Sequence, residues 1–442
     1  MCNCMKKLSI HSPYKNLTLL ATLFVNCAFI NNVFASNVIS VDTQSIVSRI
    51  DALSDPSNKI SPEFKIPTQL KQRTAFWYDI YTLYGERDHV VHHTLYPWIV
   101  YKVINTKDIY DSQLHRWTKY HKEKKTVAAE VREIRIALRN LSKKTSYKKL
   151  KGLEKTIFDK LSSLPGSRRK VIREAAENLR IQLGQKDFLI SGIKNSTKYL
   201  PHIEAALEDA GLPVELARLP FVESSFNVDA ESRVGASGIW QIMPVTGKSF
   251  LIVSDAIDER NSPLKATYAA AQILKQNYKS LKNWPLAVTA YNHGVGGVRS
   301  AMRQSKTDNL PDLIDKYHQG SFRFASANFY SSFLAVLHAQ KYKLEVFKNY
   351  PLEFSSALET HVVLLDRPMR FNNLVASLGL NRDLLIEYNL DLKVAAENNA
   401  RIPRGYKLIL PAETKQKIQD LISSGRSQFK SASLPGVPSS SS

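Results

Sequence analysis

Cysteine is nearly absent from this chain. The 442 residues include only Cys2, Cys4 and Cys27, so no pair of cysteines exists beyond residue 27. The rest of the chain is therefore expected to fold without disulfide bonds or a thiolate metal site. The same early segment has lysines followed by an apolar run at residues 17–30 and then Val33-Phe-Ala35. This order predicts a secretory signal peptide at 1–35.

The apolar run is shorter than a membrane-spanning helix requires. We therefore expect an exported protein of the periplasm or cell envelope. Two alternatives, an uncleaved anchor and lipidation at Cys27, would make the chain membrane-associated.

Acidic residues are scarce over one long stretch. The formal net charge is +21, and residues 101–200 hold 25 Lys and Arg against 10 Asp and Glu. Such a surplus is typical of a surface that meets a polyanion, for which an anionic envelope surface is a candidate. A solvated helical face is the alternative. We expect no nucleic acid as a partner, because the signal peptide predicts export.

Metal-binding residues are also sparse. His89, His92 and His93 lie close together, and a helical histidine pair at such a spacing can bind zinc. No cysteine or paired carboxylate nearby completes a ligand set, so we expect no metal and no cofactor. The aromatic residues around these histidines are predicted to form a core rather than a sugar-stacking surface.

One acid, Glu223, is placed for chemistry. Pro213 suits the first turn of a helix, on which Leu216, Leu219 and Glu223 share one face. A carboxyl group in apolar surroundings has a raised pKa, which suits a general acid near neutral pH. Glu223 is therefore the predicted catalytic residue. Pro220 predicts a kink or an end of the helix just before it.

Two later segments supply polar groups. Gly238-Ile-Trp-Gln241 combines a glycine, which lets the backbone approach a ligand, with an amide that donates and accepts. Ala290-Tyr-Asn292 places Tyr291 and Asn292 on an otherwise apolar helix face, where polar groups need partners. We predict that Gln241, Tyr291 and Asn292 bind substrate, and structural hydrogen bonds are the alternative.

In this order, Glu223-Ser224, Gly238–Gln241 and Ala290–Asn292 resemble the motifs of lytic transglycosylases of glycoside hydrolase family 23. The resemblance covers about residues 191–344 well and residues 359–411 faintly. It implies a lysozyme-like, mainly helical catalytic domain with a groove, and it adds Ser224 to the substrate-binding residues.

The resemblance also implies a reaction. The enzyme would cleave the β-1,4 bond between N-acetylmuramic acid and N-acetylglucosamine in peptidoglycan and form a 1,6-anhydro end. Glu223 would protonate the leaving oxygen and then take the proton of the attacking O6 hydroxyl. A lysozyme-type hydrolase would need a second carboxylate, for which Asp229 and Glu231 are the nearest candidates. That hydrolase and a non-catalytic peptidoglycan-binding protein are the alternatives.

The sequence departs from the family pattern in one segment. A Glu-Thr pair followed closely by Tyr is usual in the last helix, and residues 326–330 (Ser-Ala-Asn-Phe-Tyr) occupy the equivalent stretch. Tyr330 is predicted to orient Glu223, with Phe329 as the alternative equivalent. The glutamate is lost, so substrate contacts at this end of the groove are expected to differ.

The periodicity predicts a mainly helical chain of several parts. A helical seam at Val127, Val131, Ile134, Leu138 and Leu141 indicates a basic helical hairpin. The end of the module near residue 411, with Asn389, resembles a degenerate lysin motif. The expected parts are a signal peptide at 1–35, a polar lead at 36–68, an aromatic-rich and basic helical accessory region at 69–190, a catalytic domain at 191–350, a small α+β lysin-motif-like module at 359–412 and a disordered tail at 423–442.

Overall fold

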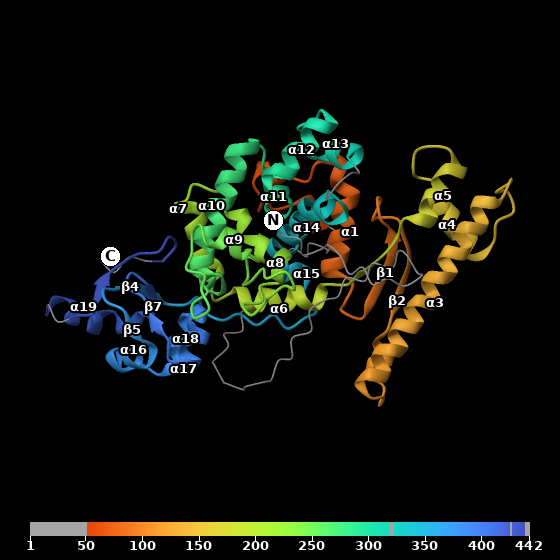
Figure 1. The fold of residues 1–442 in the computed structure, drawn as a ribbon. Coiled ribbons are helices and arrows are strands. Elements are labelled where there is room, and N and C mark those ends of the chain that lie inside the picture. Colours follow the sequence, from red (N-terminus) through yellow and green to blue (C-terminus); the bar gives the residue numbers. More distant parts are fainter. Residues whose placement is uncertain (1–50, 318–321, 425–426, 438–442) are drawn as a thin grey trace.

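The computed structural model describes residues 51–317, 322–424 and 427–437. Figure 1 shows a central helical body with an elongated arm on one side and a small module on the other. Within the described ranges, no helix is both long and apolar enough to cross a membrane. The predicted signal peptide at 1–35 lies outside the described residues.

The central body is helical, as predicted for residues 191–350. Its innermost element is α14 (Phe324–Lys341), which is buried from Tyr330 to Gln340. The other helices of this range are α6 (Lys186–Ser196), α7 (Leu200–Asp209), α8 (Leu219–Ser224), α9 (Pro244–Gly247), α10 (Pro263–Leu281), α11 (Trp284–His293), α12 (Val295–Ser305), α13 (Leu310–Lys316) and α15 (Lys343–Val346). Of these, α8, α11 and α15 pack directly against α14 (Figure 1).

Residues 51–82 belong to the same hydrophobic core. Three 3-10 helices (Asp51–Ser54, Pro62–Phe64 and Thr68–Leu70) lead into α1 (Lys71–Thr82). Phe64 is fully buried, with its ring centroid 6.2 Å from that of Trp284 and 5.6 Å from that of Phe333. The expectation of a polar lead is therefore wrong for residues 51–68, because aromatic and aliphatic residues without regular spacing pack into the body.

Helix α1 also belongs to the body rather than to an accessory region. It packs along α14, where Asn328 accepts hydrogen bonds from Arg73 at 2.9 Å and from Trp77 at 3.0 Å. The predicted boundary at residue 69 therefore divides one packed unit. The separate arm begins only after α1, with the strand at Asp88.

The arm combines a sheet with helices. Strands β1 (Asp88–His93), β2 (Val100–Asn105) and β3 (Leu179–Leu183) form an antiparallel sheet in the order β2-β1-β3. Its helices are α2 (Lys107–Asp111), α3 (Arg116–Lys143), α4 (Gly152–Leu161) and α5 (Arg168–Glu177). The predicted seam of α3, from Val127 to Leu141, is buried. The purely helical description was wrong, because the β-branched residues of β1 and β2 favour strands.

The C-terminal module is α+β. Strand β4 (Thr360–Leu365) pairs antiparallel with β7 (Lys407–Pro411), and β5 (Met369–Arg370) pairs with β6 (Arg401–Ile402). Between them lie α16 (Phe371–Leu378), α17 (Arg382–Tyr388) and α18 (Lys393–Glu397), and α19 (Lys415–Ser423) follows. Asn389 is fully buried and joins α17 to β7, because its amide nitrogen donates to Ile409 O at 2.7 Å and its oxygen accepts from Ile409 N at 2.9 Å.

The described part of the predicted disordered tail is ordered. Strand β8 (Phe429–Ser431) pairs with β4. Leu434 and Val437 then pack into the core of the central body, and the amide of Gly436 donates to Asp209 Oδ2 at 3.0 Å. The serine-rich composition suggested disorder, but the few apolar residues among the serines are buried.

A buried ionic cluster connects the module to the central body. Lys265 of α10 lies 2.8 Å from Asp391 Oδ2 and 3.2 Å from Glu259 Oε1. The hydroxyl of Tyr406 donates to the same Asp391 oxygen at 2.7 Å. These four residues are less than a tenth exposed. Breaking such a cluster leaves an unpaired buried charge, so it favours a single docked position of the module.

Candidate active site

The predicted acid lies at the end of a short helix. Residues Val214–Arg218 form a 3-10 helix, and α8 starts anew at Leu219 with Pro220 in its first turn. The expected kink is therefore a helix start, where proline costs little because its missing N–H would have no partner. Leu216 and Leu219 are fully buried, and Glu223 at the end of α8 is partly exposed. The apolar stripe thus leads to a carboxyl group at the surface of the core.

A tight turn follows the acid. Ser225 and Phe226 both have left-handed backbone conformations, with φ of 52° and 58°. Such conformations are strained for residues with a side chain and persist only where the surroundings fix them. Phe226 is fully buried against Phe221, with ring centroids 4.9 Å apart. Burial of Phe226 therefore holds the turn, and with it the end of the helix that carries Glu223.

The loop of the second motif contacts the acid's neighbour. The Ser224 hydroxyl lies 3.0 Å from Ile239 O and 3.1 Å from Pro220 O. Gly238 has a φ of 72°, and a Cβ there would lie 1.9 Å from Arg260 O. Gln241 is buried, and its amide nitrogen donates to the backbone carbonyls of Gly238 at 2.9 Å and Ala230 at 3.1 Å. The Gln241 side chain therefore holds the loop from within.

The third motif contacts the same loop. The Tyr291 hydroxyl donates to Trp240 O at 2.9 Å, and Tyr291 remains partly exposed. The Trp240 ring is fully buried and donates to Thr267 at 2.9 Å, so it belongs to the core. The structure thus brings together the three segments that the sequence singled out.

The segment that departs from the family pattern lies beside the third motif. The Ser326 hydroxyl is 3.4 Å from Asn292 Oδ1 and 2.9 Å from His293 Nδ1. Ser326 is the first residue of the stretch 326–330 that departs from the family pattern, and it makes a hydroxyl–imidazole contact. Tyr330, one helical turn further on, is 1% exposed, and burial raises the pKa of its phenol. Its hydroxyl has no hydrogen-bond partner among the described residues.

The structure adds a residue that sequence reasoning did not select. Tyr81 of α1 is 6% exposed, and burial raises the pKa of its phenol. The negative charge of Glu223 contributes to this rise, which places Tyr81 in the electrostatic surroundings of the acid. The dense aromatic cluster from Phe76 onward is the one feature of the sequence that points to Tyr81. No feature of the sequence connects that cluster to Glu223.

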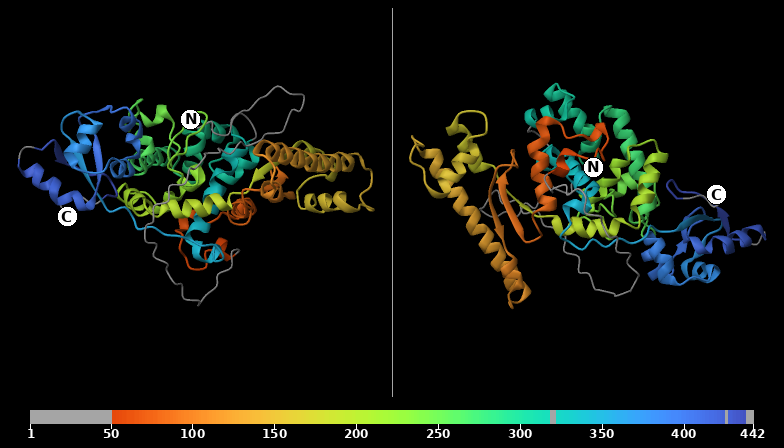
Figure 2. Two further views of the ribbon diagram at one scale, coloured as in Figure 1. Left: turned by 90° about the horizontal axis from the view of Figure 1, so that it is seen from below. Right: turned by 180° about the vertical axis from the view of Figure 1, so that it is seen from behind.

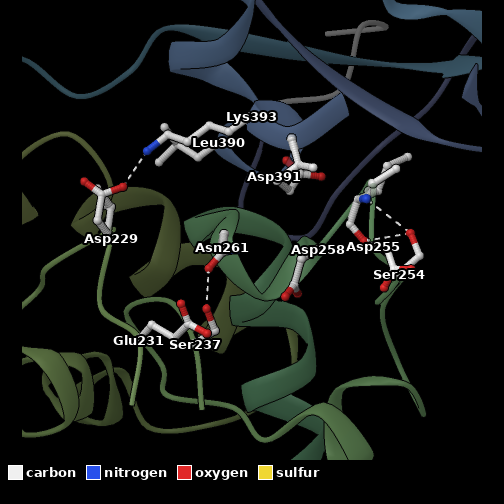
Figure 3. Close-up of a pocket in the computed structure, with 14 residues that line it drawn as sticks. Asp229, Glu231, Ser237, Ser254, Asp255, Asp258, Asn261, Leu390, Asp391 and Lys393 are labelled. Carbon is white, nitrogen blue, oxygen red and sulfur yellow. Dashed lines mark hydrogen bonds and ion pairs between the residues drawn. The ribbon is translucent and has the colours of Figure 1, made fainter. Parts of the chain in front are cut away.

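The two nearby acids line a cleft beside the C-terminal module. Asp229 forms an ion pair with Lys393 of α18, and Glu231 forms an isolated β-bridge with Ser237. Figure 3 shows both in the wall of a cleft of about 190 Å³ that also contains Asp391 and Lys393. Asp229 therefore already has a charged partner outside the catalytic motifs.

The histidines of the arm do not form the helical pair that the sequence analysis considered for zinc. His89, His92 and His93 lie on strand β1 rather than on a helix, and His89 Nε2 lies 2.9 Å from Glu123 Oε1. No cluster of three or more His, Cys, Asp or Glu side chains suited to a metal ion occurs in the parts of the chain that the structure describes.

The central region of the chain is similar to known proteins. Residues 201–312 match the Transglycosylase SLT domain family. Over 126 residues the chain is 34% identical to membrane-bound lytic murein transglycosylase D of Escherichia coli (strain K12), covering 28% of this chain and 28% of that protein. It is also 36% identical over 94 residues to a transglycosylase of Enterobacteria phage PRD1, covering 21% of this chain and 32% of the phage protein. The match spans under a third of the lengths of these relatives.

Proposed function

We propose that this chain, whose residues 201–312 match the Transglycosylase SLT domain family, is a murein lytic transglycosylase. The observation that carries the proposal is the convergence of the three motifs. Ser224, next to the acid, contacts Ile239 O, and Tyr291 contacts Trp240 O, so two consecutive carbonyls of one loop connect both motifs to the end of α8. This arrangement fixes the position of Glu223 at the surface of a packed core.

In the proposed mechanism Glu223 is the only catalytic acid. It protonates the glycosidic oxygen between N-acetylmuramic acid and N-acetylglucosamine as the C1–O bond breaks. The resulting carboxylate then takes the proton from the muramic O6 hydroxyl as O6 bonds to C1. The product is a 1,6-anhydro end, no water is consumed, and Glu223 regains its proton. Tyr81 is the phenol proposed to orient the acid. The Tyr330 hydroxyl has no hydrogen-bond partner among the described residues, so its predicted orienting role is not part of this proposal.

Of the remaining predicted residues, Tyr291 and Asn292 are proposed to hold the sugar, and Gln241 and Ser224 to hold the loop beside it. Gln241 shapes the loop through its amide nitrogen, while Tyr291 and Asn292 lie on the α11 face that meets this loop and α14. Ser224 aligns the loop with the end of α8. In this arrangement the substrate contacts come from three segments that are fixed to one another.

The lysozyme-type hydrolase is less well supported. That mechanism needs a second carboxylate near the first. Asp229, the closest candidate in sequence, is paired with Lys393 and lines the cleft beside the module. The third candidate, a non-catalytic peptidoglycan-binding protein, would retain the substrate without cutting it.

We further propose that residues 359–412 are a degenerate lysin-motif-like module. The support is the order of elements, in which the paired strands β4 and β7 flank α16 and α17, together with the buried Asn389 at the end of α17. Peptidoglycan glycan strands are the proposed partner of the whole chain. The proposed location is the periplasm or cell envelope, with the basic arm facing an anionic surface.

The test is incubation of the purified chain with isolated murein, followed by analysis of the soluble products. Release of muropeptides with anhydro ends supports the transglycosylase. Products with reducing ends would favour the hydrolase, and binding without any release would favour the non-catalytic protein.

A further inference from the structure

The free end of α3 presents an unusual combination of exposed side chains. Leu114, Trp117 and Tyr120 are 38%, 68% and 40% exposed. The Trp117 ring contacts Tyr120 edge-on with centroids 6.5 Å apart and stacks on His121 at 6.4 Å. The other four tryptophans are buried or partly buried. These aromatic side chains are left in solvent although their burial elsewhere would stabilise the fold.

The aromatic group lies in a basic segment of the chain, next to the exposed acids Asp108 and Asp111 of α2. The segment Leu114–Lys125, here called the tip, contains five Lys and Arg and one acid. The acid, Glu123, is turned back into the arm: its carboxylate lies 2.9 Å from His89 and accepts from the Tyr110 hydroxyl at 2.6 Å. These contacts lower the pKa of Glu123, which keeps it charged and engaged. The outward surface of the tip is therefore aromatic and cationic.

The tip lies where a large surface can reach it. Figures 1 and 2 show α3 extending beyond the small sheet at the end that follows α2, while its other end, beside α4 and α5, lies farther out from the central body. The C-terminal module lies on the opposite side of that body. Contacts of Glu123 with β1 and α2 hold the tip in place, so its side chains are presented together.

We propose that the tip docks on a bilayer that contains anionic phospholipids. Trp and Tyr prefer the headgroup level of a membrane, where an apolar ring and a polar edge are both satisfied. Lysines near such a surface are attracted by the lipid phosphates. A glycan strand, which also stacks on exposed aromatic rings, is the alternative occupant, and the murein arm of the test below separates it from a bilayer. This inference concerns a second surface and does not depend on the role of Glu223.

The test compares two double variants of the full chain in vesicle co-sedimentation. Lys124→Gln with Lys125→Gln removes two charges from the tip. Lys148→Gln with Lys149→Gln removes two exposed charges from the α3–α4 loop of the same arm. Binding to vesicles of phosphatidylcholine with phosphatidylglycerol should fall roughly 30-fold in the tip variant, about fivefold for each charge. The loop variant should change little, and vesicles of phosphatidylcholine alone should bind neither protein through the tip.

A fluorescence measurement tests the same contact without relying on charge. Trp117 is the most exposed tryptophan, so anionic vesicles should shift the emission of the chain to shorter wavelength, and Trp117→Phe should abolish that shift. Equal losses of binding in both double variants, or a shift that persists in Trp117→Phe, would overturn the proposal. So would a tip variant that loses binding to isolated murein but not to vesicles.

Discussion

The Ser224 hydroxyl lies 3.0 Å from the carbonyl oxygen of Ile239. Residue 224 follows the acid directly, and residue 239 belongs to the loop that also accepts the Tyr291 hydrogen bond at Trp240. A displacement of the loop is therefore transmitted to the end of α8. The hydrogen bonds that connect the three motifs end on backbone carbonyls of this loop. The position of Glu223 therefore depends on the packing that fixes the backbone of the loop and of the turn after α8.

The first prediction concerns the acid itself. Glu223→Gln should abolish murein cleavage, because the amide has nearly the same shape but cannot donate and retake a proton. Folding should be almost unchanged, measured by circular dichroism and thermal unfolding. Glu208→Gln, an exposed acid of α7, is the matched control and should cleave normally. Normal turnover by Glu223→Gln would remove Glu223 from the mechanism.

The second prediction concerns the close approach of α6 to the turn after the acid. A Cβ at Gly192 would lie 2.5 Å from Ser225 O and 3.2 Å from the Phe221 ring. Gly192→Ala should therefore displace the strained turn and lower kcat at least tenfold, with a loss of about 1–3 kcal/mol in unfolding free energy. Gly296→Ala in α12 is the control.

Nothing lies within 4 Å of a Cβ placed at Gly296. Alanine there should be neutral or stabilise the helix by up to about 1 kcal/mol, with normal activity. If both alanine variants behave alike in assays of murein release and in urea unfolding, packing against the turn does not control the site.

The third prediction concerns the buried ionic cluster between the body and the module. Lys265→Met should lower the unfolding free energy by about 3–5 kcal/mol, because Asp391 and Glu259 lose their buried counter-charge. Lys279→Met, on the exposed side of the same helix, should cost under about 0.5 kcal/mol.

A double variant separates the pair from its surroundings. Lys265→Met with Asp391→Asn removes both charges, so it should be less destabilised than the sum of the two single variants in urea unfolding. Strict additivity would contradict a direct interaction between these side chains.

The fourth prediction concerns acid stability. Burial lowers the pKa of His92 to about 3 and that of His93 to about 4. In the unfolded chain both titrate near pH 6.5, so between these values the unfolded state binds protons that the folded state does not. Stability is therefore complete above pH 6.5 and falls with decreasing pH, by up to about 1.4 kcal/mol per pH unit for each histidine.

His92→Phe should flatten this dependence between pH 6.5 and 4, because phenylalanine does not titrate and the site is already lined by Phe76 and Phe324. An unaltered profile in His92→Phe would show that this histidine is not the source of acid sensitivity.

Local patterns predicted the elements that carry the motifs. The buried residues Leu216 and Leu219, the start of α11 at Trp284 and the seam of α3 follow from helical spacing and from the positions of proline. The packing of α1 against α14 was not predictable, because the Arg73–Asn328 hydrogen bond joins residues 255 positions apart. The packing of α1 against α14 also places Tyr81 near Glu223, which the sequence does not predict.

The roles of polar residues were the least predictable part. The amide of Gln241 is suited to binding a ligand, so the sequence predicted that role. In the structure its nitrogen donates to two backbone carbonyls of the loop instead. From the sequence, Asp229 is a candidate for a second catalytic acid. The structure pairs it with Lys393, which lies 164 residues away in sequence. Both depend on contacts that no local pattern encodes.

The central claim, a single acid that closes an anhydro ring without water, is tested most directly by mass spectrometry of muropeptides released in water enriched in ¹⁸O. The account predicts products with 1,6-anhydro ends that contain no ¹⁸O from the cleavage step. Products with ¹⁸O at C1 of a reducing end would contradict it.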